Sequence, residues 1–306
     1  MAGNIWAKKT TAGFTIGSSF NDNQLMAIQI NRTTMRLPLL FLFFFSFQGQ
    51  AEIKTISIGE LKVEYELKGT GNTTIFLEAG GSADLSDWEP VYKELSKHFR
   101  TIRYSRIGNG NSSKIRKNYS AEEYAEEAYS ILKALNVDGK IVYVAHSYGA
   151  SIARVFASMH PKKIAALMLI EPASEHDVEI MRRIDLERAE QEIAKIKLND
   201  LKRGMSNQYL DFWSKRPLPD YPEIPDVPVT VIASIKKYND PSNLFFTDEA
   251  REIWGELHTQ WALDFPKGEI VLTTDSYHSP QNEEPELVIR EIVKLVNRTY
   301  EGIKDN

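Results

Sequence analysis

The sequence contains no cysteine among its 306 residues. A thiol nucleophile, a disulfide framework and a thiolate metal site are therefore excluded. Basic residues are not concentrated either: 37 Lys and Arg stand against 42 Asp and Glu, and they form no dense run. The chain thus lacks the electrostatic footprint of a nucleic-acid-binding protein. With 42% hydrophobic and 26% charged residues, it has an ordinary globular composition. A chain of this length buries about three quarters of its unfolded surface and needs no disulfide or metal to fold.

A hydrophobic run long enough to span a membrane is also missing. The apolar run at residues 37–47, LPLLFLFFFSF, has eleven residues, whereas a spanning helix needs about 20. Arg32 and Arg36 precede this run, and Gly49-Gln50-Ala51 follows it with small residues at alternate positions. A basic segment, an apolar segment and a small-x-small cleavage site are typical of a secretory signal peptide.

These features predict three parts at the amino-terminal end. We expect residues 1–34 to be an upstream extension, residues 35–51 to be the signal peptide, and the mature protein to begin near Glu52. The mature protein is then secreted or periplasmic and has no stable membrane span. The alternative is an amino-terminal membrane anchor that is never cut, which also places the domain outside the cytoplasm.

Strand and helix patterns alternate regularly from residue 73 to residue 172. Short apolar runs, as expected of strands buried on both faces, are separated by segments with helical spacing. An antiparallel hairpin with its turn at Gly59-Glu60 comes before them. The strands are expected at 74–77, 101–104, 141–144 and 164–170, and the helices at 86–98, 119–135 and 148–159. This order indicates βαβ units on a parallel sheet.

The alternation stops at residues 174–226, which are charged, helical in pattern and finally rich in proline. We predict that this segment is a small helical cap insertion. The alternation then resumes with a strand at 229–233, a helix within 244–264, a strand at 269–273 and a helix at 285–296. The predicted fold is α/β, with a mostly parallel eight-stranded sheet flanked by helices. Residues 52–173 and 227–300 form its core.

The segment Ala145-His146-Ser147-Tyr148-Gly149 lies between a predicted buried strand and a predicted helix. In a nucleophile elbow, such a turn places a serine at the top of the sheet in a strained conformation. The residues two before and two after the serine must be small, and Ala145 and Gly149 are. The N-terminus of the following helix directs unpaired N–H groups at the site where an oxyanion forms. Ser147 is therefore the candidate nucleophile; the alternative is a plain turn that uses Gly149 for close packing.

A glycine pair follows an earlier buried strand, in Leu77-Glu78-Ala79-Gly80-Gly81-Ser82. The loop after that strand supplies an oxyanion donor in hydrolases with a nucleophile elbow. Gly80 and Gly81 let the backbone approach a substrate closely. An ordinary glycine turn would have the same sequence.

His278 is the best candidate for a general base among the six histidines. It follows the final predicted strand, and imidazole suits proton transfer at neutral pH. His98 and His160 lie at helix ends, where a structural role is expected. No pair of histidines has zinc-ligand spacing such as H-E-x-x-H.

A carboxylate must orient this histidine, and two strand ends could supply it. Glu171 directly follows the strand at 164–170, whereas Asp240 lies several residues beyond the strand at 229–233. Function concentrates at strand tips in such sheets, so Glu171 is favoured narrowly and Asp240 is the alternate. Asp177 is a distant third. Either carboxylate could instead be a solvated loop residue.

Together these residues resemble the α/β-hydrolase superfamily over the stretch from 53 to 298. The run at 104–112, Tyr-Ser-Arg-Ile-Gly-Asn-Gly-Asn-Ser, is similar to the family's Y-D-R-x-G-x-G-x-S loop, with Ser105 in place of Asp. Residues 282–288 are similar to the run after the family's catalytic histidine. The sequence departs at the usual G-x-x-D, which is Ser234-Ile235-Lys236-Lys237 here. The resemblance implies that the acid is Glu171, on the earlier strand, as in some lipases of this fold.

By position in the family, the backbone N–H groups of Gly81 and Tyr148 would form the oxyanion hole. The resemblance implies a carboxylesterase-like serine hydrolase that cleaves a small ester or amide through an acyl-serine intermediate. Such an enzyme takes a small-molecule substrate and needs neither a metal nor an organic cofactor. The same triad could instead serve a C–C hydrolase, an aminopeptidase or a cofactor-free haloperoxidase. A catalytically silent binding protein on the same fold is the other alternative. The sequence does not indicate the oligomeric state.

Overall fold

The computed structural model describes residues 53–114, 119–173, 177–202 and 223–304. The chain divides into two units, Met1–Gln48 and Gly49–Asn306. The first unit, the predicted extension and the whole of the predicted signal peptide lie outside the described residues. Residues 174–176 and 203–222 of the predicted cap also lie outside the described residues.

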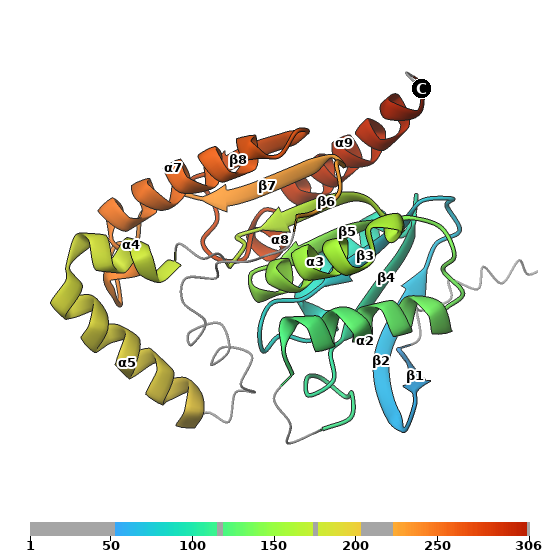
Figure 1. Ribbon diagram of the computed structural model, residues 1–306, viewed down its shortest axis with the longest axis horizontal. Helices are drawn as coiled ribbons and strands as arrows, with labels where there is room; N and C mark the ends of the chain where they lie inside the picture. Colours follow the sequence, from blue (N-terminus) through green and yellow to red (C-terminus); the bar gives the residue numbers. More distant parts are fainter. Residues whose placement is uncertain (1–52, 115–118, 174–176, 203–222, 305–306) are drawn as a thin grey trace, which may run out of the picture. The chain divides into compact units, whose positions relative to one another are not determined.

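One eight-stranded sheet forms the centre of the second unit (Figure 1). Its strands lie in the order β1-β2-β4-β3-β5-β6-β7-β8. The two pairs that involve β2 are antiparallel, and the other five are parallel. The strands are β1 Lys54–Ile58, β2 Leu61–Lys68, β3 Thr74–Glu78, β4 Arg100–Ser105, β5 Ile141–His146, β6 Ile164–Ile170, β7 Val229–Ser234 and β8 Gly268–Thr273. The expected mostly parallel eight-stranded sheet is confirmed.

Helices cover both faces of the sheet, and each face has its own apolar core (Figure 1). On one face, α2, α3 and the end of α7 pack on the sheet. On the other face, α1 and α9 do so. The helices are η1 Leu85–Trp88, α1 Glu89–Leu95, α2 Ala121–Ala134, α3 Tyr148–Met159, η2 Pro161–Lys163, α4 Asp177–Ile184, α5 Leu186–Lys202, η3 Leu244–Phe246, α7 Asp248–Asp264, α8 Pro280–Glu283 and α9 Pro285–Lys304. Since both faces are covered, a central strand such as β6 is apolar along its whole length.

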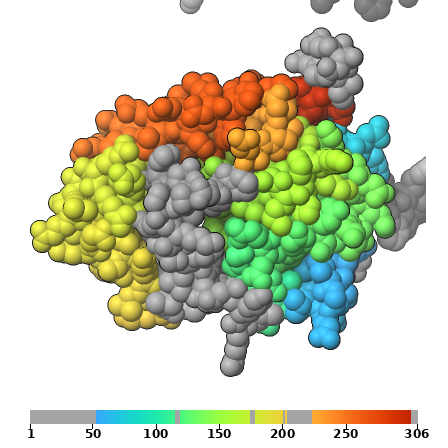
Figure 2. All heavy atoms as spheres, in the orientation of Figure 1, coloured from blue at the N-terminus to red at the C-terminus, as the bar shows by residue number. Residues whose placement is uncertain are grey.

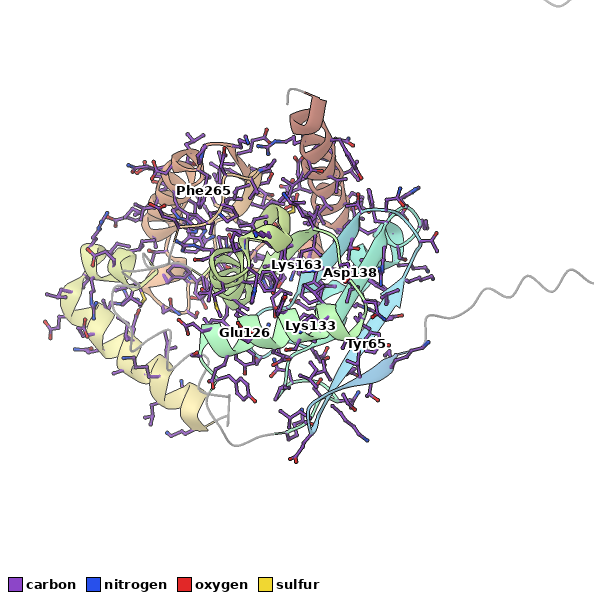
Figure 3. All side chains as sticks on the ribbon, turned by 45° about the vertical axis from the view of Figure 1, so that its right-hand side comes forward. Tyr65, Glu126, Lys133, Asp138, Lys163 and Phe265 are labelled. Carbon is purple, nitrogen blue, oxygen red and sulfur yellow. The ribbon has the colours of Figure 1, made fainter. Side chains whose placement is uncertain are left out.

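Local signals fix several element ends. Ser120 and Glu123 form the expected capping box at the start of α2, each side chain accepting from the other residue's backbone N–H. At the amino-terminal edge of the sheet, Lys163 donates to the carbonyls of Val137 and Asp138, both at 2.9 Å (Figure 3). These bonds tie the start of β6 to the start of β5. The opposite edge, where the parallel strands end, is left for the loops that carry Ser147, Glu171 and His278.

Two helices of the predicted cap, α4 and α5, lie within the described residues. Ile180 of α4 is buried against Ala233 at the end of β7 and Trp254 of α7. Ala189 and Ile193 of α5 are buried in a second small cluster with α4 and η3. Figure 2 shows these two helices, coloured yellow, as a lobe beside the orange α7 segment. This contact places α4 at the carboxyl edge of the sheet.

Glu127 of α2 is a carboxylic acid that is buried between α2 and the sheet. One of its oxygens accepts the N–H of Ile107 at 2.9 Å, and the other has no hydrogen-bond partner among the described residues. Burial raises the pKa of Glu127 to about 8, with the nearby charge of Glu78 acting in the same direction. The folded state therefore keeps a proton that the unfolded state releases above about pH 4.5.

We expect Glu127→Gln to stabilise the protein at neutral pH by about 2 to 3 kcal/mol. Glutamine keeps an acceptor for Ile107 and carries no charge. In the wild type, this site's contribution to the free energy of unfolding falls as the pH rises from about 4.5 to about 8. Urea titrations of both proteins across this range measure the difference. Glu256→Gln, at an exposed position of α7, is the control. If the free energy of unfolding of Glu127→Gln depended on pH as steeply as that of the wild type, Glu127 would not be the buried protonated group.

Candidate active site

Ser147 lies at the tight turn between β5 and α3, with φ of 50° and ψ of −121°. A non-glycine residue in this region of φ costs about 1–3 kcal/mol, so the surrounding structure must hold it. Its N–H donates to Ile170 at 3.0 Å, and its carbonyl accepts from Ala150 and Ala173. A side chain at Gly149 would come within 2.6 Å of the Ala79 carbonyl. Small residues are therefore required around this turn, as the sequence pattern predicts.

His278 contacts the Ser147 hydroxyl from the loop between β8 and α8. Its Nε2 lies 3.0 Å from Ser147 Oγ, and its Nδ1 lies 3.4 Å from Glu171 Oε2. The carboxylate only accepts, so Nδ1 carries the proton and Nε2 accepts from the serine hydroxyl. The His278 side chain is 51% exposed, so a substrate can reach it. The three groups form the chain of hydrogen bonds that makes a serine nucleophilic.

Glu171 lies at the tip of β6 and is 2% exposed. Arg251 of α7 donates to both of its oxygens, at 3.2 and 3.3 Å, and the Ser234 N–H and Trp254 Nε1 donate to Oε1. Burial alone would raise the pKa of Glu171. The hydrogen bond with His278 and the charge of Arg251 outweigh it and lower that pKa to about 2. Glu171 is therefore ionised at neutral pH, as the orienting acid must be.

The other acid candidates do not join this group. Asp240 is exposed, and within the described part of the chain it makes no hydrogen bond or ion pair. The side chain of Asp177 lies outside the described residues. Ser234 stands where the usual acid loop begins, and its backbone N–H donates to Glu171 instead. Glu171 itself has φ of 42°, the same kind of backbone strain as Ser147.

The glycine loop after β3, residues 79–81, is held through its backbone carbonyls by one side chain. Arg106 donates to the carbonyls of Ala79, Gly80 and Gly81. In a trans peptide the N–H points opposite to the C=O, so the Gly81 N–H points away from Arg106. The neighbouring Gly80 N–H is taken by Asp87 at 3.2 Å. The Gly81 N–H is thus the donor this loop can offer an oxyanion.

Tyr148 offers the second donor because it is the first residue of α3. The N–H groups of a first helical turn have no partner within the helix. Gly80 lies above this turn: a side chain there would come within 3.5 Å of Ser147 Cβ. The glycine loop thus lies beside the nucleophile, and Gly81 and Tyr148 remain the predicted oxyanion donors.

Ser105, which replaces the aspartate of the similar family loop, is paired with a carboxylate from another strand. Its hydroxyl donates to Glu64 of β2 at 2.7 Å. Glu64 also accepts from the backbone N–H and the side-chain amide of Asn111. Glu64 of β2 thus supplies a carboxylate to the loop that carries Arg106.

Four residues of this site were not assigned a role from the sequence. Arg106 lies in the recognised run at 104–112, which was the signal that could have marked it. Asp87, Arg251 and Trp254 carry no such signal, since only the folded chain brings Asp87 to Gly80 and the other two to Glu171. As for metals, the described ranges contain no group of three or more His, Asp or Glu side chains that could hold an ion.

The chain is similar to known proteins over part of its length, and the family match includes Ser147 and Glu171 but not His278. Residues 73–223 match the family model described as alpha/beta hydrolase fold. An uncharacterised protein of Bacillus subtilis is 33% identical over 106 residues, which cover 35% of this chain and 42% of that protein. The 2-hydroxy-6-oxo-6-(2'-aminophenyl)hexa-2,4-dienoic acid hydrolase of Metapseudomonas resinovorans is 27% identical over 120 residues, covering 39% and 41%.

These matched segments span about two fifths of the two relatives' length. Among solved structures, a thermophilic esterase from Thermogutta terrifontis superimposes with a TM-score of 0.54. Its identity is 21%, and the match covers 82% of this chain and 99% of that one. At this identity the likeness concerns the fold.

Proposed function

Because the chain belongs to the α/β-hydrolase-fold superfamily, we propose that it is a serine hydrolase that cleaves a small ester or amide through an acyl-Ser147 intermediate. The observation that carries the proposal is the chain of contacts from Ser147 Oγ through His278 to Glu171. The nucleophile, the base and the orienting acid each come from a different strand end, and all three meet at one edge of the sheet.

In the first half of the proposed reaction, Ser147 Oγ attacks the substrate carbonyl carbon while His278 Nε2 takes the hydroxyl proton. The carbonyl oxygen becomes an oxyanion that accepts from the N–H groups of Gly81 and Tyr148. Each such donor contributes about 3 kcal/mol to transition-state stabilisation. Collapse of the intermediate breaks the bond to the leaving group, which receives the proton from His278. The acyl group stays on Ser147.

In the second half, water attacks the acyl carbon and His278 Nε2 takes its proton. The second oxyanion collapses, the acid product leaves, and the proton returns to Ser147 Oγ. Glu171 stays ionised throughout and stabilises the imidazolium that forms twice in the cycle. The cap would shape the pocket for the acyl or leaving group.

A C–C hydrolase is the second candidate, favoured by the similarity to the dienoic acid hydrolase of Metapseudomonas resinovorans. A substrate panel separates the two. Aryl esters of increasing chain length, an aminoacyl amide and a diketone are offered to the wild type and to Ser147→Ala. We expect ester turnover that depends on chain length and is lost in the variant. Cleavage of the diketone without ester turnover would favour the second candidate. Ester turnover that survives in the variant would overturn both.

We also propose that the domain acts outside the cytoplasm, which rests on the sequence of residues 35–51. The described residues include no helix that is both long and apolar enough to cross a membrane. The amino-terminal sequence of the protein isolated from expressing cells tests the proposal. A start near Glu52 is expected, and an intact segment at 35–51 in a cytoplasmic fraction would contradict it.

A further inference from the structure

A second histidine–carboxylate pair lies beside the triad and takes no part in the proposed reaction steps. His146, the residue before the nucleophile, has its Nδ1 3.0 Å from Asp87 Oδ2. Both side chains are almost fully buried, His146 at the end of β5 and Asp87 in η1. A buried pair of this kind must have its hydrogen-bonding groups satisfied to be tolerated.

The other ring nitrogen of His146 contacts the base itself. Its Nε2 lies 2.7 Å from the backbone carbonyl of His278. A carboxylate and a carbonyl can only accept, so both ring nitrogens must donate, and only the imidazolium can do so. Among the described residues, two titratable groups lie beside this ring: the Asp87 carboxylate, and the His278 ring at 5.0 Å between centroids. The glycine loop meets it through the backbone of Gly80.

Asp87 connects the His146 ring to the other parts of the site. It accepts the Gly80 N–H at 3.2 Å, Gln281 Nε2 at 2.9 Å and Asn282 Nδ2 at 3.3 Å. Burial would raise the pKa of Asp87, but its bond to His146 and its other donors lower that pKa to about 2. One ionised carboxylate thus holds the glycine loop, the turn before Ser147 and the helix after His278.

The packing around the pair leaves little room for movement. A side chain at Gly80 would come within 2.9 Å of His146 Nδ1. The His278 ring is half exposed and is fixed mainly by its contacts with Ser147 and Glu171. His146, in contrast, contacts the backbone carbonyl of His278. A shift of this carbonyl would move the His278 ring relative to both Ser147 and the Gly81 donor.

We propose that His146 is an imidazolium held between Asp87 and the His278 carbonyl, and that it is a positioning residue for the catalytic base. The inference rests on the proposed function in that His278 is taken to be the base. The pair adds no net charge to the site. Its effect is to set the distances from the base to the Ser147 hydroxyl and to the oxyanion donors. The rate of such reactions depends steeply on these distances.

The test combines the nitrogen spectrum of the histidine rings with steady-state kinetics. Long-range ¹⁵N–¹H spectra of the histidine-labelled wild type are recorded at about pH 7, where a free histidine is mostly neutral. The His146 signal is identified by its loss in His146→Gln. We expect both of its ring nitrogens to show the protonated shift, and one of them to become unprotonated in Asp87→Asn.

The same variants are then assayed on the preferred ester. We expect kcat to fall about tenfold to a hundredfold in Asp87→Asn and in His146→Gln, with KM changed by less than about twofold. His98→Gln, which removes an exposed histidine outside the site, keeps the wild-type kcat. A neutral His146 in the wild type would overturn the proposal, as would wild-type kcat in both variants. The spectra need no turnover, so a wild type inactive on esters would count against the proposed function alone.

Discussion

Replacing Ser147 with alanine is expected to lower kcat on the preferred ester by about a millionfold. Alanine removes the Oγ that forms the acyl-enzyme and leaves His278 Nε2 without the hydroxyl at 3.0 Å. The Gly81 and Tyr148 donors remain, so the residual rate above the uncatalysed reaction measures what the oxyanion hole and binding supply alone. Single-turnover and steady-state kinetics measure this rate, at enzyme concentrations high enough to detect the residual activity.

Ser151→Ala is the matched control for this substitution. Ser151 lies one helical turn after Ser147, on α3, and is fully buried. Its hydroxyl is directed at the Ala173 carbonyl at 3.5 Å and not at His278. We expect its kcat to stay within a few-fold of the wild type. Similar losses in Ser147→Ala and Ser151→Ala would mean that the helix, and not the hydroxyl of Ser147, is what the reaction requires.

Glu171→Gln is expected to lower kcat by about ten thousandfold, whereas Asp240→Asn should leave it within about twofold. The glutamine amide cannot stabilise an imidazolium, and its NH₂ group can favour the wrong tautomer of His278. Asp240 is exposed and makes no hydrogen bond or ion pair within the described residues. The comparison of the two variants at the same pH therefore decides which carboxylate serves the base. A collapse of kcat in Asp240→Asn alone would show that the acid is assigned to the wrong strand.

Loss of the Glu171 charge also leaves the Arg251 guanidinium buried without its ion pair. Breaking such a pair costs about 3 to 5 kcal/mol of stability, so a fall in activity could come from unfolding. The double variant Glu171→Gln/Arg251→Met removes the unpaired charge. We expect it to recover much of the lost stability in thermal unfolding while kcat stays low. Recovery of kcat together with stability would mean that Glu171 has only a structural role.

The elements near the site were predictable because local sequence fixes them. The strand at 164–170 and the helix at 148–159 have the predicted bounds, since an uninterrupted apolar run and a small-residue helix ended by proline leave few alternatives. The last helix was predicted to end at Val296 but continues to Lys304. Its final turns are polar, so hydrophobic periodicity gave no reason to extend it.

The site was predictable only as far as chain order constrains it. Ser147, Glu171 and His278 each follow a strand whose carboxyl end lies at the same sheet edge, so parallel topology brings them together. Asp87 and Arg251 follow no such rule. Asp87 reaches His146 across 59 residues, and Arg251 reaches Glu171 across 80. Such contacts depend on how η1 and α7 pack on the finished sheet, and periodicity and turn signals do not report that packing.

Labelling by a fluorophosphonate probe tests most directly whether Ser147 is an activated nucleophile. The probe forms a covalent bond only with a serine that a neighbouring base activates. We expect the wild type to be labelled on the peptide that contains Ser147, and Ser147→Ala and His278→Ala to stay unlabelled. A folded wild type that the probe does not label, or a label that persists in Ser147→Ala, would contradict the assignment of Ser147, His278 and Glu171 as a working triad.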